Sequence, residues 1–337
     1  MLNLYKIVFL NSMVLGTLIS ITSYSWFSMW MGLEINLLSI IPLFNSSKNM
    51  MSSESSMKYF ITQALASLVL LFSIIMMLSS TEFITPQVNS SFLMMLNSAL
   101  LIKLGAAPFH FWFPEVMEGL TWMNSLILLT WQKVAPMILI MNNKLNISFL
   151  TFVVFSCLII SSLNAINQVS LRKIMAFSSI NHIGWMISAM MNSFSVWLIY
   201  FLVYILISIN IVVVFWMTNS FFVNQITNSI NQNKMFKFTL MANFLSLGGL
   251  PPFLGFLPKW LTIWSLILNQ MYTLTFFLIV LTLIMLFIYI RLIFSSLLIS
   301  SAENKIFKIK FNNFYLILLN FLTLSSLILC TYLFNFL

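Results

Sequence analysis

Long uncharged stretches dominate this sequence. From residue 194 to residue 217 the chain carries no charged side chain, and similar apolar runs come before and after it. Only 6% of the residues are charged, 61% are hydrophobic and the mean hydropathy is +1.03, whereas soluble domains carry about 25% charged residues. Apolar side chains would therefore cover the surface as well as the core, which only a bilayer stabilises. The sequence predicts an integral membrane protein and excludes a soluble globular domain.

The apolar runs predict how many times the chain crosses the bilayer. At about 28 to 30 residues per helix and turn, given about 20 residues per span, the 337 residues hold about eleven or twelve spans. Polar residues, prolines and glycines separate the apolar runs. The runs predict eleven helices at residues 4–22, 25–44, 58–80, 89–118, 121–141, 147–168, 174–191, 194–217, 237–266, 271–298 and 313–336. We therefore expect an all-α polytopic membrane protein with about 11 transmembrane helices.

Charged residues between the spans indicate the orientation. With eleven spans, the side of the N-terminus receives most of the basic residues and the other side receives essentially one, Lys144. Such asymmetry marks the inner face of a membrane. The N-terminus is thus expected inside, the C-terminus outside, and the net charge of +9 is expected to serve topology and an anionic leaflet rather than nucleic acid. The basic residues on the N-terminal side are Lys6, Lys48, Lys58, Arg172, Lys173, Lys234, Lys237, Lys305, Lys308 and Lys310.

Two of the expected spans contain helix-breaking residues. The fourth includes Gly105–Pro108, and the ninth includes Gly248–Pro252 followed by Gly255 and Pro258. Proline removes a backbone donor and glycine relaxes the chain, so each span is predicted to be two half-helices joined by unwound backbone. At membrane depth such backbone persists only beside protein or water. A proline kink without a function is the alternative for either span alone.

The spacing of the two broken spans predicts an internal repeat. They lie five spans apart, and repeats of five helices enter the membrane from opposite sides, which is an inverted repeat of the kind found in transporters. We expect a first repeat at residues 1–141, a second at 147–298 and an additional C-terminal transmembrane helix at 313–336.

Four ionisable residues lie at positions in the expected spans where the bilayer should exclude charge: Glu34, Lys103, Lys133 and Lys259. Each costs about 2.5 to 3.5 kcal/mol at the centre of a membrane helix and is by default a candidate functional residue. Lys133 is about eight residues from the nearer end of its span, or about 12 Å at 1.5 Å per residue, which is too far for its side chain to reach the membrane surface. Lys103 precedes the Gly105 break, where unwound backbone can admit water.

Glu34 requires a basic partner inside the membrane, and a lysine is the obvious one. At about 7 Å and an effective dielectric near 20, the two charges would interact by about 2.4 kcal/mol.

Lys259 lies beyond Pro258, nearer a membrane face. The competing explanation for this lysine is that its side chain extends to the membrane surface. His182 lies mid-span among Ser and Asn residues, which suits either a water-linked proton relay or a hydrogen-bonded structural role.

Motifs for chemistry on a bound cofactor are absent from the sequence. Cys157 and Cys330 are distant residues within apolar runs, and there is no phosphate-binding loop, no dinucleotide fingerprint and no HExxH motif. Lysines and a glutamate store protons but coordinate other cations poorly. The residues therefore favour proton movement.

Seven segments carry a resemblance to a known family. In order and spacing they resemble the mitochondrial NADH-ubiquinone oxidoreductase chain 2 family, antiporter-like membrane subunits of respiratory complex I. The resemblance covers about residues 24 to 265 and joins broken helices, lysines and an acid in one pattern. The segments are Met31–Asn36, Lys103–Trp112, Glu118–Leu120, Trp131–Lys133, Ser170–Lys173, Ser178–Gly184 and Gly248–Pro252.

The resemblance implies a proton-translocating subunit of NADH:ubiquinone reductase, with Glu34 and Lys103 as coupling pair, Lys133 as central relay lysine, Lys259 near the exit and His182 on the hydrated axis. It implies a multi-pass protein of the mitochondrial inner membrane, with its N-terminus in the matrix and its C-terminus in the intermembrane space. NADH, FMN, iron-sulfur clusters and ubiquinone would belong to partner subunits, with no cofactor in this chain. Its partners would be other membrane-arm subunits and inner-membrane lipids, cardiolipin among the candidates.

Two other functions fit parts of the sequence. A stand-alone cation/proton antiporter would share the fold and the lysines, although the chain has no Asp and few acids to coordinate Na⁺. In a purely structural membrane subunit, the lysines would only fix helix packing.

Overall fold

The computed structural model describes residues 4–46, 49–80, 86–143, 146–225, 234–251, 253–298 and residue 321. Within these ranges the chain forms α-helices and no β-strand, apart from an isolated bridge between Ser170 and Phe222. Several sequence predictions concern residues outside these ranges: nearly all of the last span at 313–336, Pro252, Cys330, and the lysines Lys48, Lys144, Lys305, Lys308 and Lys310.

Seven segments of the described residues are long and apolar enough to cross a membrane: Leu4–Thr22, Trp26–Phe44, Met50–Ser79, Trp122–Asn142, Ile147–Ala165, Phe194–Thr218 and Tyr272–Phe294. The other helices are shortened by breaks or carry more polar residues. The structure thus confirms a helical protein with several membrane-length helices. The total of eleven spans and the inverted repeat stay predictions.

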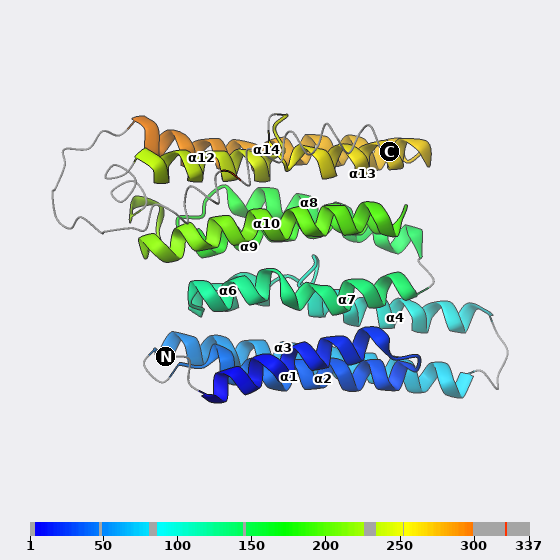
Figure 1. Ribbon diagram of the computed structural model, residues 1–337. Helices are drawn as coiled ribbons and strands as arrows, with labels where there is room; N and C mark the ends of the chain where they lie inside the picture. The colour runs from blue at the N-terminus through cyan, green and yellow to red at the C-terminus, as the bar shows by residue number, and fades with distance from the viewer. Residues whose placement is uncertain are drawn as a thin grey trace. The chain divides into compact units, whose positions relative to one another are not determined.

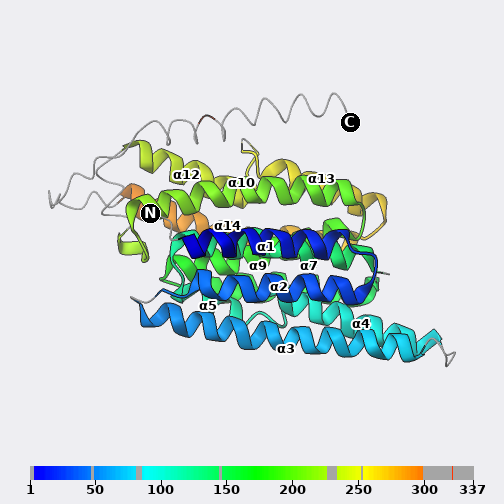
Figure 2. The same cartoon turned by 60° about the horizontal axis from the view of Figure 1, so that its bottom comes forward.

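The helices group into two compact units, Met1–Val153 and Val154–Leu337. In the first unit, α2 packs against α1 and α3, α4 lies between α3 and α7, and α5 packs on α3 (Figure 2). Its helices are α1 (Leu4–Thr22), α2 (Trp26–Phe44), α3 (Met50–Ser80), α4 (Pro86–Leu104), α5 (Trp112–Gly119), α6 (Trp122–Leu129) and α7 (Trp131–Asn142), and α8 (Ile147–Ala165) begins in this unit.

In the second unit, α9 packs against α10, α13 and α14, and α12 packs against α10 and α14. Figure 1 shows α12 and α13 following one another along one direction with the interrupted segment between them. The bounds are α9 (Leu171–Met190), α10 (Phe194–Thr218), α12 (Lys234–Gly248), α13 (Phe256–Leu268) and α14 (Tyr272–Leu298).

Both predicted interruptions are present. The backbone leaves the helix after Leu104 and re-enters at Trp112, and it leaves again after Gly248 and re-enters at Phe256. Gly105 and Gly249 take the left-handed conformation, with φ of 74° and 76°, which glycine adopts without the steric cost that a side chain would add. The glycines therefore end the helices where the sequence predicts.

Most helix ends lie within about three residues of the predicted ends, and two helices differ by more. The helix expected at 58–80 begins at Met50, because Ser52 bonds the carbonyl oxygen of Asn49 and Lys58 forms ion pairs with Glu54 and Glu115, so polar residues extend the helix beyond its apolar part. The single helix expected at 121–141 is two helices, α6 and α7, which meet at Thr130.

Candidate functional site

A close helix crossing fixes the position of α2 in the first unit. A Cβ atom added to Gly32 would lie 2.6 Å from the backbone nitrogen of Ser20 and 2.8 Å from the carbonyl oxygen of Gly16. One added to Gly16 would lie 2.8 Å from the backbone nitrogen of Asn36. Only glycine lets the backbones of α1 and α2 approach this closely. The crossing holds Glu34 and Asn36 on a rigid part of α2.

The break after α4 positions Lys103. Gln63 on α3 donates a hydrogen bond to the carbonyl oxygen of Lys103 at 3.4 Å, and the indole of Trp112 donates one to the carbonyl oxygen of Ile102 at 3.1 Å. Carbonyl groups at a helix end lack partners within the helix. Neighbouring side chains supply them here, so the end of α4 is stable and buried.

Glu34 on α2 and Lys103 at the end of α4 lie in the first unit, near enough for their charges to attract each other. Lys103 is 7% exposed, and the Oε1 atom of Glu34 is buried without a hydrogen-bond partner among the described residues. In the described part of the chain, the salt bridges join Lys58 to Glu54 and Glu115, and none joins Glu34 to Lys103. The carboxylate and the ammonium are therefore not directly paired in this structure.

Lys133 lies in the first turn of α7 and is 1% exposed. Its Nζ atom lies 5.8 Å from the ring centroid of Phe113 on α5, a cation–π contact. The backbone turn before it is irregular, because Thr130 has ψ of −69° and its hydroxyl bonds the carbonyl oxygen of Leu126 at 2.7 Å. The junction of α6 and α7 therefore lies three residues before Lys133.

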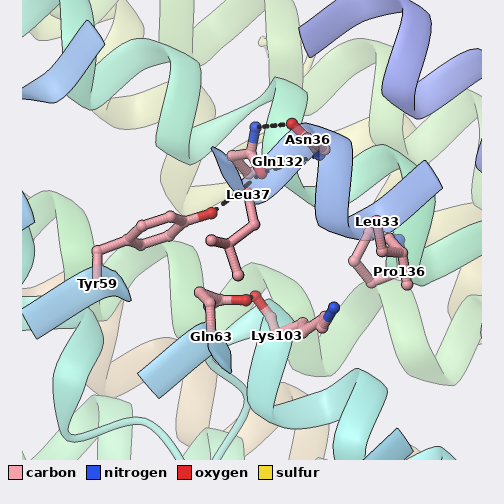
Figure 3. A pocket seen from close by; sticks show the side chains of 8 residues that line it. All are labelled: Leu33, Asn36, Leu37, Tyr59, Gln63, Lys103, Gln132 and Pro136. Carbon is pink, nitrogen blue, oxygen red and sulfur yellow. Dashed lines mark hydrogen bonds between the residues drawn. The ribbon is translucent and has the colours of Figure 1, made fainter. Parts of the chain in front are cut away.

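A hydrogen-bonded side-chain cluster, which the sequence prediction missed, joins α2, α3 and α7. The side-chain amides of Asn36 and Gln132 bond each other twice, at 3.1 and 3.2 Å, and the hydroxyl of Tyr59 donates to Oε1 of Gln132 at 3.3 Å. This amide cluster borders a small cavity that Lys103 and Gln63 also line (Figure 3). Asn36 and Gln132 lie close in sequence to Glu34 and Lys133, and this closeness is the sequence feature that could have identified them.

The second unit places His182 in a set of aromatic hydroxyl groups. Helix α9 is buried on nearly all sides, and His182 is 4% exposed. Its Nδ1 lies 2.9 Å from the hydroxyl oxygen of Tyr200 on α10, and its ring centroid is 5.2 Å from that of Tyr204. The sequence prediction missed both tyrosines, because they lie in an apolar run without other polar markers.

Lys259 is buried, which opposes the alternative that its side chain extends to the membrane surface. It is 8% exposed, and its Nζ atom donates hydrogen bonds to the carbonyl oxygens of Leu247 at 3.1 Å and Gly248 at 2.9 Å. The same atom lies 5.7 Å from the ring centroid of Trp185. Lys259 at the start of α13 therefore stabilises the C-terminal end of α12, across the predicted break.

The geometry thus brings Glu34, Lys103 and Lys133 into the first unit, and His182 and Lys259 into the second. Among the described residues, no group of three or more His, Cys, Asp or Glu side chains could hold a metal ion. The functional groups are ionisable or hydroxyl-bearing side chains in buried surroundings, an arrangement that can hold and pass protons.

Comparison with known proteins identifies relatives of the whole chain. Residues 23–286 match the family described as NADH:quinone oxidoreductase/Mrp antiporter, TM. NADH-ubiquinone oxidoreductase chain 2 of Anopheles gambiae is 50% identical over 328 residues, and that of Aedes aegypti is 50% identical over 330 residues. Each alignment covers 96% of this chain and 96% of the relative.

A solved structure has the same fold. A chain in respiratory complex I from Thermus thermophilus with bound aureothin superposes with a TM-score of 0.86 at 20% identity, covering 98% of this chain and 78% of that one. The family match spans most of the sequence, and the two mosquito relatives share half of the aligned residues along nearly the full length. The chain therefore belongs to the NADH-ubiquinone oxidoreductase chain 2 family of the NADH:quinone oxidoreductase/Mrp antiporter membrane proteins.

Proposed function

We propose that this chain is a proton-translocating membrane-arm subunit of respiratory complex I and that Glu34, Lys103, Lys133, His182 and Lys259 carry or gate the protons. The observation that carries the proposal is the burial of Lys103 at the end of α4, near a Glu34 carboxylate whose Oε1 atom is also buried and to which Lys103 forms no salt bridge among the described residues. The attraction between a partly buried acid and a buried lysine that no salt bridge joins can change when one helix shifts slightly. The names of the relatives support the assignment to complex I.

The proposed mechanism is a two-state relay. Quinone reduction elsewhere in the complex changes the separation of Glu34 and Lys103, and a lysine gives up its proton more easily when its carboxylate partner moves away. Lys133 and then Lys259 respond in turn, one accepting a proton from one side and the other releasing it. Moving one charge against about 100 mV requires about 2.3 kcal/mol, which matches the scale of one such charge pair.

The relay requires that the buried lysines move charge and do not only hold the helices together. Each of Lys103, Lys133 and Lys259 is at most 8% exposed. Burying a charged group is expensive unless it is paired or hydrated. If these positions served only to pack helices, an apolar side chain would do so without the free-energy cost of burying a charge. The three buried lysines therefore support a role in charge movement.

Substitution of the pair tests this function. We expect Glu34→Gln and Lys103→Met each to lower the number of protons pumped per electron in the assembled complex. The double variant should lose little more than either single variant, because each change already removes the same interaction. Glu54→Gln, at an exposed surface ion pair, is the matched control and should pump normally. Normal pumping by assembled Glu34→Gln and Lys103→Met complexes would contradict the proposal.

A stand-alone cation/proton antiporter subunit is the second candidate, because the matching family description also includes Mrp antiporters. A native gel in mild detergent separates the two. The chain is located by peptide mass spectrometry and the same lane is stained for NADH oxidation. Migration with a very large NADH-oxidising assembly supports complex I, whereas a small membrane complex without that activity supports the antiporter.

The proposal includes the location and the partners. The protein would span the mitochondrial inner membrane many times, with its N-terminus in the matrix and its C-terminus in the intermembrane space, as the distribution of Lys and Arg supports. Its partners would be other membrane-arm subunits and anionic lipids such as cardiolipin. NADH, FMN, iron-sulfur clusters and ubiquinone would be bound by partner subunits. Protease protection of tagged termini in intact mitoplasts tests the orientation.

A further inference from the structure

A small cavity in the first unit lies beside Lys103. Its polar lining comes from Lys103 on α4, Tyr59 and Gln63 on α3, Asn36 on α2 and Gln132 on α7 (Figure 3). The volume available to water is about 10 Å³, close to the minimum that one ordered water occupies. Five polar residues around a space of this size exceed the two to four partners that a buried water requires.

Gln132 is held in one orientation at the edge of this cavity. Its Oε1 atom accepts hydrogen bonds from Nδ2 of Asn36 and from the hydroxyl of Tyr59, and its Nε2 atom donates to Oδ1 of Asn36. Asn36 is 4% exposed and Tyr59 is 3% exposed, so water does not replace these partners easily. The amide of Gln132, which is itself only half-buried, therefore cannot turn without breaking these three partly buried hydrogen bonds.

The remaining hydrogen-bonding capacity of the cluster suits a water molecule. The second N–H group of the Gln132 amide is a donor beyond the bond to Asn36, and the Tyr59 oxygen can accept while its proton is donated to Gln132. The Lys103 ammonium has three donors and no acceptor, and Glu34 forms no salt bridge with it in the described residues. An oxygen acceptor near Lys103 would supply what the lysine lacks.

We propose that Gln132, locked by Asn36 and Tyr59, is a positioning residue that holds one water molecule against the Lys103 ammonium. The water accepts a hydrogen bond from Lys103, donates one to the Tyr59 oxygen and accepts one from the Gln132 amide. It thus stabilises the charged form of Lys103 in the state where Glu34 is not paired with it. This inference rests on the proposed proton-translocating function, and it adds Gln132 to the residues proposed to act in the relay.

The test measures protons pumped per electron in inner-membrane vesicles that contain the assembled complex. Gln132→Met keeps the length of the side chain and removes its hydrogen bonds, and we expect it to lose as many protons per electron as Lys103→Met. The matched control is Gln168→Met, because the side chain of Gln168 donates a hydrogen bond to the nearby carbonyl oxygen of Asn164 in the last turn of α8, and this variant should pump normally.

An exchange of the two amides separates positioning from packing. Gln132→Asn alone shortens the side chain and should lower pumping. The double variant Asn36→Gln with Gln132→Asn restores the combined length of the pair, and we expect it to recover the lost pumping. A purely structural role for Gln132 predicts reduced assembly of the single variants but no change in protons per electron in the complexes that do assemble.

The outcomes distinguish this inference from the proposed function. If Gln132→Met pumps normally while Lys133→Met does not, the water position is wrong and the relay stands. If Lys103→Met and Lys133→Met also pump normally, the proposed function itself is wrong. If Gln132→Met fails to assemble, the deciding variant is Tyr59→Phe. Its control is Tyr272→Phe, which changes an exposed tyrosine. Reduced pumping by Tyr59→Phe supports the inference, and normal pumping overturns it.

Discussion

The Nζ atom of Lys259 lies 2.9 Å from the carbonyl oxygen of Gly248 and donates a hydrogen bond to it. The lysine lies in the first turn of the helix on one side of the interruption, and the glycine ends the helix on the other side. A Cβ atom added to the next residue, Gly249, would lie 2.7 Å from Cδ of Lys259. The break and the lysine are therefore one structural feature, and a shift of either half-helix changes the surroundings of the ammonium.

Removing this lysine should weaken the second unit as well as proton transfer. Lys259→Met leaves the carbonyl oxygens of Leu247 and Gly248 without their donor, at about 1–3 kcal/mol for a buried unsatisfied group. We expect the complex to dissociate at a lower temperature and to pump fewer protons per electron. Thermal treatment followed by native gels measures the first effect.

Lys237→Met on α12 is the matched control and should leave both properties unchanged. Unchanged heat resistance of Lys259→Met would show that the two hydrogen bonds contribute nothing measurable.

Tyr200→Phe should affect proton transfer more than stability. The change removes the hydroxyl group 2.9 Å from Nδ1 of His182 and keeps the ring that packs on Trp185. One hydrogen bond contributes about 1 kcal/mol to stability, so assembly should persist. Because the change removes a hydrogen-bond partner of the His182 ring, and such partners tune how the ring binds and releases a proton, we expect fewer protons pumped per electron.

Tyr272→Phe, at an exposed position, is the reference for this comparison. Equal pumping by Tyr200→Phe and Tyr272→Phe complexes would assign His182 a structural role only.

Gly32→Ala should reduce the amount of assembled complex. The added Cβ atom would lie 2.6 Å from the backbone nitrogen of Ser20, and backbone atoms cannot move aside as a flexible side chain can. The helices α1 and α2 must separate, which displaces Glu34 and Asn36. Immunodetection on native gels measures assembly, and Met31→Ala, at an exposed neighbouring position, serves as the control. Wild-type assembly of Gly32→Ala would mean that the crossing tolerates a wider spacing.

The sequence predicts the helix breaks well because their cause is local. Gly105 and Gly249 have positive φ angles, and the glycine and proline residues that produce the breaks are visible in the sequence. The break at Thr130 was missed because no glycine or proline stands there. Thr130 departs from helical geometry there, with φ of −113° and ψ of −69°, and threonine occurs in many regular helices.

Long-range pairs could not be predicted from the sequence. Asn36 and Gln132 are 96 positions apart, and only the packing of α2 near α7 brings their amides together. Hydropathy located Lys259 near an expected membrane surface, whereas the structure buries it against Trp185 and two carbonyl oxygens. The hydropathy pattern of the sequence identifies which polar residues are costly to bury, but the structure is needed to find the groups that they contact.

Lys133 offers the most direct test of proton transfer through this chain. It is 1% exposed in α7, and methionine has a similar length without the charge. The measurement is the number of protons pumped per electron by assembled Lys133→Met complex, beside Lys6→Met as a control near the start of α1. A lower ratio for Lys133→Met with normal assembly, and an unchanged ratio for Lys6→Met, is the expected result. An assembled Lys133→Met complex with the wild-type ratio would contradict the proposed relay.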